Sequence, residues 1–317
     1  MARPSVAVVI PAYNRAATLR RCLESVVGQT LEPSEVIVVD DGSEDGTAGI
    51  AREYARRGVR CIRVQENAGA QAARNRGITG ATAEWIAFLD SDDEWLVDKL
   101  QRQMMALETV AFDPWTVVHS AAITIDESNG RQRLMTVPPM EGANPRRQLL
   151  TQTGPLLQSM LVSKQALEAI GLLDESVPSY QEWDTAIRLA ERCRFLYISE
   201  PTFVYRRNHG SETISSDAVR DIEGYQYVLD KFESDILSEC GREVWEEHVS
   251  CQLRRSLDGG LWSYADRYFE ILPKRDFRIR VLQLCRLAHI RPSRLSRVRN
   301  VAKRVGSVRL TRQGEST

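Results

Sequence analysis

The chain has 317 residues, of which 43% are hydrophobic, and its formal net charge is −1. This composition suits a globular protein with a sizeable core, and it gives no overall attraction to nucleic acid. No apolar run reaches the roughly 18 residues that cross a bilayer, and the six cysteines form no CxxC pair and no zinc-ligand spacing. We therefore expect a cytoplasmic protein, with attachment to the cytoplasmic face of a membrane left open.

The first hundred residues alternate between short apolar runs and amphipathic runs. Strands are predicted at residues 6–10, 35–39, 60–64 and 84–89, and helices at residues 19–26, 47–57, 71–80 and 95–107. Strands that are apolar throughout and alternate with helices form a mostly parallel sheet covered on both faces. No GxGxxG motif follows the first strand, which argues against a dinucleotide site.

The rest of the chain has a looser pattern that becomes helical. A hairpin is predicted around Asn129 and Gly130, and the other predicted elements are strands at 156–162, 194–198 and 202–205 and helices at 163–171 and 182–193. From about residue 217 the pattern is helical to the end. We predict a body at residues 1–215, with halves at 1–110 and 111–215, and a helical extension at residues 216–317.

The end of this extension is strongly basic. From Lys274 to Arg312 there are thirteen Lys and Arg residues and one acid, Asp276. Such a segment suits contact with phosphates or with an anionic membrane surface. A solvated charged tail without a partner explains the composition equally well.

Three carboxylates follow the apolar run that ends at residue 89. Asp90, Ser91 and Asp92 stand where a buried strand should emerge, which is where open α/β sheets bind ligands. Paired carboxylates can hold a hard divalent cation against a diphosphate, and with Asp93 their mutual repulsion favours such a cation. Mn²⁺ or Mg²⁺ suits the site better than Zn²⁺ because no His or Cys stands beside these acids. Capping of the next helix is the competing explanation.

Two further groups stand near predicted strand ends in the first half. Asp41 follows the second strand and could accept a hydrogen bond from a ribose hydroxyl or a uracil N–H, or simply cap the next helix. An EF-hand is excluded there because its twelfth position would be Arg52 instead of Glu. Arg74 lies on the helix after the third strand and could reach a phosphate, or be a solvated surface charge.

The second half supplies candidates for a base and for a cationic group at a leaving diphosphate. Glu182 and Asp184 begin a predicted helix beside Tyr180 and Trp183, where partial desolvation would suit a carboxylate for removing a hydroxyl proton. The simple preference of acids for helix N-termini also explains them. Arg207 and His209 follow the last predicted strand, His209 in a predicted loop, and could neutralise a departing diphosphate.

Taken in order, these motifs resemble glycosyltransferase family 2, the inverting nucleotide-sugar transferases of the GT-A fold. The matching stretches lie between residues 5 and 211 in family order, at residues 8–15, 38–47, 67–77, 88–93, 171–176 and 183–184. The resemblance implies a GT-A fold with a helical C-terminal extension. It implies metal-dependent hexosyl transfer from a nucleoside-diphosphate sugar, with UDP as the expected nucleotide, to a hydroxyl of a glycan or lipid-linked glycan.

The resemblance also implies roles for individual residues. The implied nucleotide contacts are Pro11, Ala12, Tyr13, Asp41 and Arg74. Asp90, Ser91 and Asp92 match the DxD motif of the family, whose second acid ligates the metal. Glu182 aligns with the Asp of the family's Glu-Asp pair, the catalytic base, so that Gln181-Glu182 departs from the pattern and Asp184 is the alternative base. A catalytically inactive module that binds nucleotide sugar or a partner protein is the second interpretation.

Overall fold

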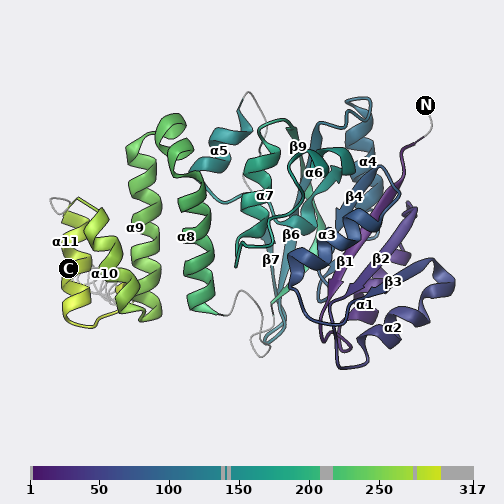
Figure 1. Ribbon diagram of the computed structural model, residues 1–317, viewed down its shortest axis with the longest axis horizontal. Coiled ribbons are helices and arrows are strands. Elements are labelled where there is room, and N and C mark those ends of the chain that lie inside the picture. Colours follow the sequence, from purple (N-terminus) through teal and green to yellow (C-terminus); the bar gives the residue numbers. More distant parts are fainter. Residues whose placement is uncertain (1–2, 137–139, 141–143, 208–216, 274–276, 294–317) are drawn as a thin grey trace, which may run out of the picture. The chain divides into compact units, whose positions relative to one another are not determined.

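The computed structural model describes residues 3–136, 140, 144–207, 217–273 and 277–293. The chain divides into two compact units, Met1–Thr213 and Ile214–Thr317. The first unit contains a nine-stranded sheet, and the second is helical (Figure 1). Within the described residues, no helix combines the length and apolar character needed to cross a membrane.

The first half of the sheet is parallel, as the alternating pattern predicts. Its strands are β1 (Val6–Ala12), β2 (Glu35–Asp40), β3 (Val59–Arg63) and β4 (Trp85–Phe88), in the spatial order β3-β2-β1-β4. The helices between them are α1 (Leu19–Val27), α2 (Thr47–Glu53) and α3 (Ala70–Gly80), and α2 is followed by a 3-10 turn, Ala55–Arg57. Because these strands run in one direction, their carboxyl ends meet at one edge of the sheet.

Helices cover both faces of these strands. Val8 and Ile10 of β1 share a core cluster with Leu23 of α1 and with buried residues of α4 (Lys99–Glu108). On the opposite face α3 lies so close to β1 that a Cβ at Gly77 would clash with the side chain of Val9. Burial on both faces explains why the strand sequences are apolar throughout.

The second half of the sheet mixes strand directions. Its strands are β5 (Glu94–Trp95), β6 (Thr116–Asp126), β7 (Arg131–Met135), β8 (Leu161–Ser163) and β9 (Arg194–Arg207). β8 pairs antiparallel with β4, β6 pairs parallel with β9, and β5 pairs antiparallel with β9. The predicted hairpin is confirmed as β6 and β7, with a left-handed Gly130 (φ +68°) in its turn.

Four of the predicted elements differ from the structure. The strand predicted at residues 156–162 is a 3-10 turn, Leu157–Ser159, followed by the short strand β8. Trp95 pairs with Phe203 in the sheet, and the helix predicted from residue 95 begins at Lys99. The two strands predicted at 194–198 and 202–205 are one strand, β9, with register shifts opposite Ser120 and Ala121. An apolar run alone does not distinguish these short elements.

The remaining helices of the first unit are α5 (Pro145–Thr151), α6 (Lys164–Ala169) and α7 (Gln181–Leu189). The second unit contains α8 (Ala218–Asp235), a π-helical turn (Ile236–Cys240), α9 (Arg242–Gly259), α10 (Trp262–Ile271) and α11 (Phe277–Leu287). Its core is formed by buried residues of α8 and α9, among them Leu229 and Leu253, together with Ala265 of α10. The helical pattern predicted from residue 217 is confirmed for these described helices.

Candidate active site

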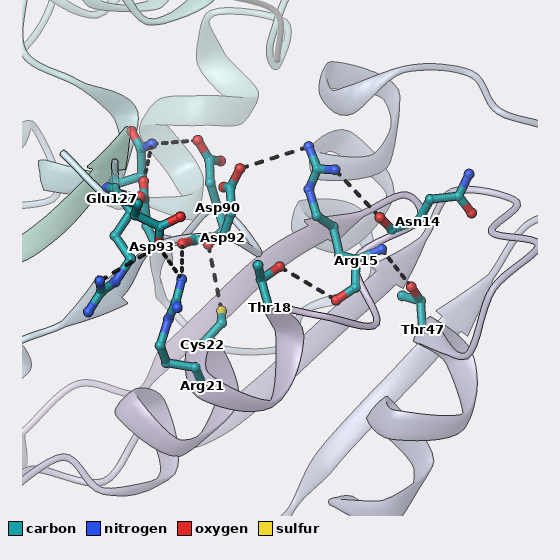
Figure 2. A network of polar contacts seen from close by, with 12 residues as sticks. Asn14, Arg15, Thr18, Arg21, Cys22, Thr47, Asp90, Asp92, Asp93 and Glu127 are labelled. Carbon is teal, nitrogen blue, oxygen red and sulfur yellow. Dashed lines mark hydrogen bonds and ion pairs between the residues drawn. The ribbon is translucent and has the colours of Figure 1, made fainter. Parts of the chain in front are cut away.

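Two loops at the carboxyl edge of the parallel strands are joined by hydrogen bonds from backbone to side chain. After β1, the N–H of Asn14 donates to Oγ of Ser43 at 2.9 Å. The N–H of Arg15 donates to Oγ1 of Thr47 at 2.7 Å (Figure 2). The N–H of Ala16 donates to Oδ2 of Asp45 at 3.0 Å. The small polar residues after β2 therefore hold the loop after β1 in place, forming one side of the site.

Asp41 holds a third loop in place. It is 2% exposed, and its carboxylate accepts the N–H groups of Ala68 and Gly69 at 3.1 and 2.7 Å. Beside it Gly42 has φ +80°, and a Cβ there would lie 3.1 Å from the backbone nitrogen of Asn67. Asp41 thereby positions the start of α3, and its implied contact with a nucleotide stays a prediction.

Asp90 lies between the two halves of the unit. One of its oxygens accepts a hydrogen bond from the guanidinium of Arg74 on α3, and the other accepts one from the side-chain amide of Gln158. The same amide of Gln158 donates to Asp93 at 3.1 Å, and the N–H of Arg206 donates to Asp93 at 2.8 Å. Asp90 is therefore held by partners from the first and the second half of the sheet.

Asp93 and Asp92 differ in their surroundings. Asp93 is 1% exposed, and burial together with the charges of Asp90 and Asp92 holds its pKa well above the ordinary value. The side chain of Asp92 is 34% exposed and lies 3.8 Å from the guanidinium of Arg15 (Figure 2). Burial and the charge of Asp90 also raise the pKa of Asp92. Of the three acids, Asp92 has the carboxylate best placed to meet a ligand.

A second set of charged residues stabilises the acidic loop of residues 90–93. Arg21 donates to the backbone carbonyl of Asp92 at 3.0 Å and forms ion pairs with Glu94 at 3.0 Å and Glu127 at 3.5 Å (Figure 2). Arg206 bonds to Glu94 as well and lies 3.6 Å from Glu127. These two arginines fix the acidic loop to β5 and β6 without using the side chains of Asp90 or Asp92.

The base candidate comes from the second half of the unit, on α7. Tyr180 precedes the helix in a left-handed conformation (φ +63°), and the indole N–H of Trp183 donates to the carbonyl of Leu149 at 2.6 Å. Strained backbone of this kind persists only where surrounding contacts enforce it. Burial raises the pKa of the partly exposed Glu182, and its charge interacts with Arg74, which lowers the pKa, and with Asp90, which raises it. Glu182 therefore shares the electrostatic environment of the acidic loop.

Asp184, the alternative base, has different surroundings. Its side chain is fully buried and forms an ion pair with Arg188 one turn later at 2.6 Å. Arg188 also donates to the carbonyls of Ile170 and Leu172, at 2.8 and 2.7 Å. This arrangement connects α7 to the end of α6, which favours a structural role for Asp184.

The remaining predicted residues lie around the same edge, as far as the structure describes them. Pro11 and Ala12 are buried at the end of β1, and Ser91 is 4% exposed. Tyr13 is 43% exposed, so its ring is available to stack on a ligand. Arg207 is exposed at the end of β9 with its guanidinium 6.0 Å from the ring centre of Tyr205. His209 lies outside the described residues.

No motif in the sequence indicated a role for Gln158, Arg15 or Asn75. Gln158 lies in a segment without a motif, and Arg15 stands inside a matching stretch without an assigned role. Asn75 joins the halves, because its amide nitrogen donates to the carbonyl of Leu173 at 2.9 Å and its oxygen accepts the N–H of Leu173 at 3.0 Å. The only sequence signal for this contact was that residues 67–77 and 171–176 are both among the stretches that match the family in order.

The comparisons with known proteins agree with this geometry. The family model of glycosyl transferase family 2 matches residues 7–167. The chain belongs to glycosyl transferase family 2. Its fold is the expected GT-A fold, because the structure resembles residues 1–349 of Staphylococcus aureus TarS in complex with UDP-GlcNAc. That likeness has a TM-score of 0.56 at 16% sequence identity, over 90% of this chain and 89% of the other.

Two curated relatives carry glycosyltransferase names. The chain is 43% identical over 106 residues to the glycosyltransferase EpsH of Bacillus subtilis, which covers 33% of this chain and 30% of EpsH. It is 28% identical over 235 residues to an uncharacterized glycosyltransferase of Rickettsia typhi, over 72% of this chain and 71% of that protein. The match with the longer TarS chain covers 88% of this chain and 50% of the TarS chain. Family 2 membership therefore rests on the shared N-terminal region.

Proposed function

We propose that this family 2 protein transfers a sugar from a nucleoside-diphosphate sugar to an acceptor hydroxyl, with inversion at the anomeric carbon. The observation that carries the proposal is the meeting of Glu182 with Arg74 and Asp90 in one electrostatic environment. A base candidate from the second half is thereby close enough to the donor-binding candidates of the first half for their charges to shift its pKa. Such neighbouring acids in different environments are typical of sites where one carboxylate takes a proton and another stays ionised.

The proposed reaction is a single displacement. Glu182 takes the proton of the acceptor hydroxyl while its oxygen forms the bond to the anomeric carbon. The bond from that carbon to the diphosphate breaks on the opposite face, and the nucleoside diphosphate leaves with the electron pair. Burial raises the pKa of Glu182. The residue is therefore a stronger base than an exposed glutamate and better matched to this proton transfer.

Asp92 is the proposed ligand of Mn²⁺ or Mg²⁺. Both oxygens of Asp90 already accept hydrogen bonds from Arg74 and Gln158, whereas Asp92 is partly exposed and has Arg15 at 3.8 Å. No group of three or more His, Cys, Asp or Glu residues in the described part of the chain is arranged to hold a metal. A single carboxylate, that of Asp92, fits a site for Mg²⁺ in which substrate phosphates and water would supply the other ligands. When bound, the ion would neutralise the leaving diphosphate.

The proposed donor is a UDP-sugar, and UDP-GlcNAc is the first to test because the similar TarS structure contains it. The proposed acceptor is a glycan or a lipid-linked glycan at the cytoplasmic face of a membrane. The basic segment from Lys274 to Arg312 would bring the protein to this membrane by its attraction to anionic lipids. Arg207 and His209 are proposed contacts of the departing diphosphate. Pro11 to Tyr13 and Asp41 are proposed contacts of the nucleotide.

The decisive experiment compares Glu182→Gln with the wild-type protein. Replacing the base while keeping its size should lower transfer by about 100-fold or more, the usual contribution of a general base, with donor affinity nearly unchanged. Released UDP measures transfer over a panel of UDP-sugars with Mn²⁺, and calorimetry measures UDP binding. The control Gln132→Glu changes an exposed side chain on β7 and should behave as wild type. Full activity of the Glu182→Gln variant would remove Glu182 from the mechanism, and wild-type binding without turnover on every acceptor would favour the inactive module.

The metal assignment has its own test in Asp92→Asn. The variant should bind UDP with little dependence on Mn²⁺, whereas the wild-type protein should bind about tenfold or more tightly when Mn²⁺ is present. UDP titrations with and without Mn²⁺ measure the difference independently of turnover. If Mn²⁺ strengthens UDP binding equally in both proteins, the metal is held elsewhere.

A further inference from the structure

The last described helix of the second unit, α11, has two different apolar faces. Ile279, Leu282 and Cys285 are 3%, 7% and 3% exposed and form its buried face. On the other face Leu284 is 65% exposed and Leu287 is 77% exposed, and these are the largest exposed fractions among the bulky hydrophobic side chains of the described residues. A helix that only completes a core has one apolar face, so the second requires an explanation.

The orientation of α11 is fixed within the second unit. Arg286 forms two hydrogen bonds with the carboxylate of Asp266 on α10, at 2.9 and 2.8 Å, and its guanidinium lies 5.4 Å from the ring centre of Trp262. The helix ends at Leu287, and the left-handed His289 in the following turn (φ +53°) packs its ring on Trp262. Rotation of the exposed leucines into the core of this unit would break these contacts.

The charged residues near the exposed leucines indicate what kind of surface could cover them. Arg280 is exposed and lies four residues before Leu284, which places it on the same side of α11, and the exposed Arg291 follows the end of the helix. The sequence that follows residue 293 carries seven Lys and Arg residues against Glu315 alone, so like charges oppose its docking on this face. A surface that is apolar below and anionic above complements leucines flanked by arginines.

We propose that the face of α11 formed by Leu284, Leu287 and Arg280 binds an anionic membrane surface, with the leucines inserted among the lipid headgroups. This inference rests on the proposed membrane location of the acceptor and assigns it to one helix. Interfacial helices bind through buried apolar area together with attraction between basic residues and anionic lipids. The remaining basic residues from Lys274 to Arg312 add to the same attraction.

The test measures co-sedimentation of the full chain with vesicles of phosphatidylcholine containing about 30% phosphatidylglycerol, against vesicles of phosphatidylcholine alone. The wild-type protein should bind the anionic vesicles, and the double variant Leu284→Ser and Leu287→Ser should bind about tenfold or more weakly, because two apolar side chains no longer insert. The matched control Leu134→Ser and Leu237→Ser removes two other exposed leucines and should bind as wild type. UDP binding should be unchanged in all of them.

Other outcomes overturn the inference. Unchanged vesicle binding by the double variant excludes α11 as the contact. If, in addition, Arg297→Gln, Arg299→Gln and Arg304→Gln together abolish binding, the membrane location survives and belongs to the basic segment. Failure of the wild-type protein to bind anionic vesicles rejects both. A second copy of the chain is the other candidate to cover this face of α11. Residues 214–273 carry thirteen acids and six basic residues, so they could attract the basic side chains beside the leucines. A wild-type dimer in sedimentation analysis that the double variant converts to monomer would establish that copy instead.

Discussion

At the scale of single residues, the most unusual group outside the site is Lys99. Its side chain is fully buried at the start of α4, and Nζ lies 5.1 Å from the ring centre of Trp95. Among the described residues Nζ has no hydrogen-bond partner, and burial lowers its pKa from 10.5 to about 7. An ammonium group without a partner in the core costs stability when it is charged.

Replacing Lys99 by Met should therefore stabilise the protein, by about 2–4 kcal/mol at neutral pH. Below pH 7 the lysine is protonated in both folded and unfolded chains, so the burial cost is fully present. Between about pH 7 and 10.5 the unfolded chain binds the extra proton, so wild-type stability rises with pH and the advantage of Lys99→Met shrinks. Urea unfolding across this range measures the difference, and the exposed Lys231→Met is the control. An advantage that does not change with pH would contradict the burial of a titrating lysine.

At the scale of elements, the contact between α3 and β1 positions the donor side of the candidate site. α3 carries Arg74, and β1 leads into Pro11 and Tyr13. The two elements approach so closely because Gly77 has no side chain where Val9 packs. Any displacement of α3 from the sheet would move the partner of Asp90.

Gly77→Ala should therefore destabilise the protein by about 1–3 kcal/mol, the usual cost of an overpacked core, and weaken UDP binding. Gly49→Ala is the matched control, because a Cβ at Gly49 in α2 meets nothing within 4 Å, and alanine there favours the helix. Thermal unfolding and UDP titration measure both effects. Equal stability of the two alanine variants would mean that Val9 moves aside without cost.

At the scale of the whole molecule, every described strand and every described site residue belongs to the first unit. That unit, Met1–Thr213, contains the core cluster around Val8, Leu23 and Leu161 and the whole acidic loop. A unit with its own core is expected to fold by itself. The exposed leucines of α11 belong to the other unit, so the proposed membrane contact and the proposed sugar transfer can be tested separately.

We predict that a fragment ending at Thr213 folds cooperatively and binds UDP with an affinity within about threefold of the full chain, since its binding groups are all retained. It should not bind the anionic vesicles. Circular dichroism during heating, UDP calorimetry and vesicle sedimentation measure these properties, with the full chain as the reference. A fragment that is unfolded, or that binds UDP far more weakly, would show that the helical unit supports the site.

The sequence by itself determined the elements of the parallel half and the chemistry of its strand ends. Apolar runs that alternate with amphipathic ones specify buried strands and covering helices, and acids directly behind such runs must lie at the sheet edge. The same reasoning failed at residues 156–162, where a short apolar run fits a strand or a 3-10 turn equally well. Ordered motifs were sufficient to identify the family, while the site assignments and the domain boundary stay predictions.

Only the tertiary structure decided which groups meet. Gln158 has no motif, and its bonds to Asp90 and Asp93 depend on the 3-10 turn reaching the acidic loop from the other half of the sheet. Glu182 and Asp184 are both acids in the first turn of α7, yet the charge of Arg74 acts on one and the other is buried against Arg188. Local pattern fixes which face of an element a residue occupies. Burial, ion pairing and pKa depend on what packs against that face, which comes from distant parts of the chain.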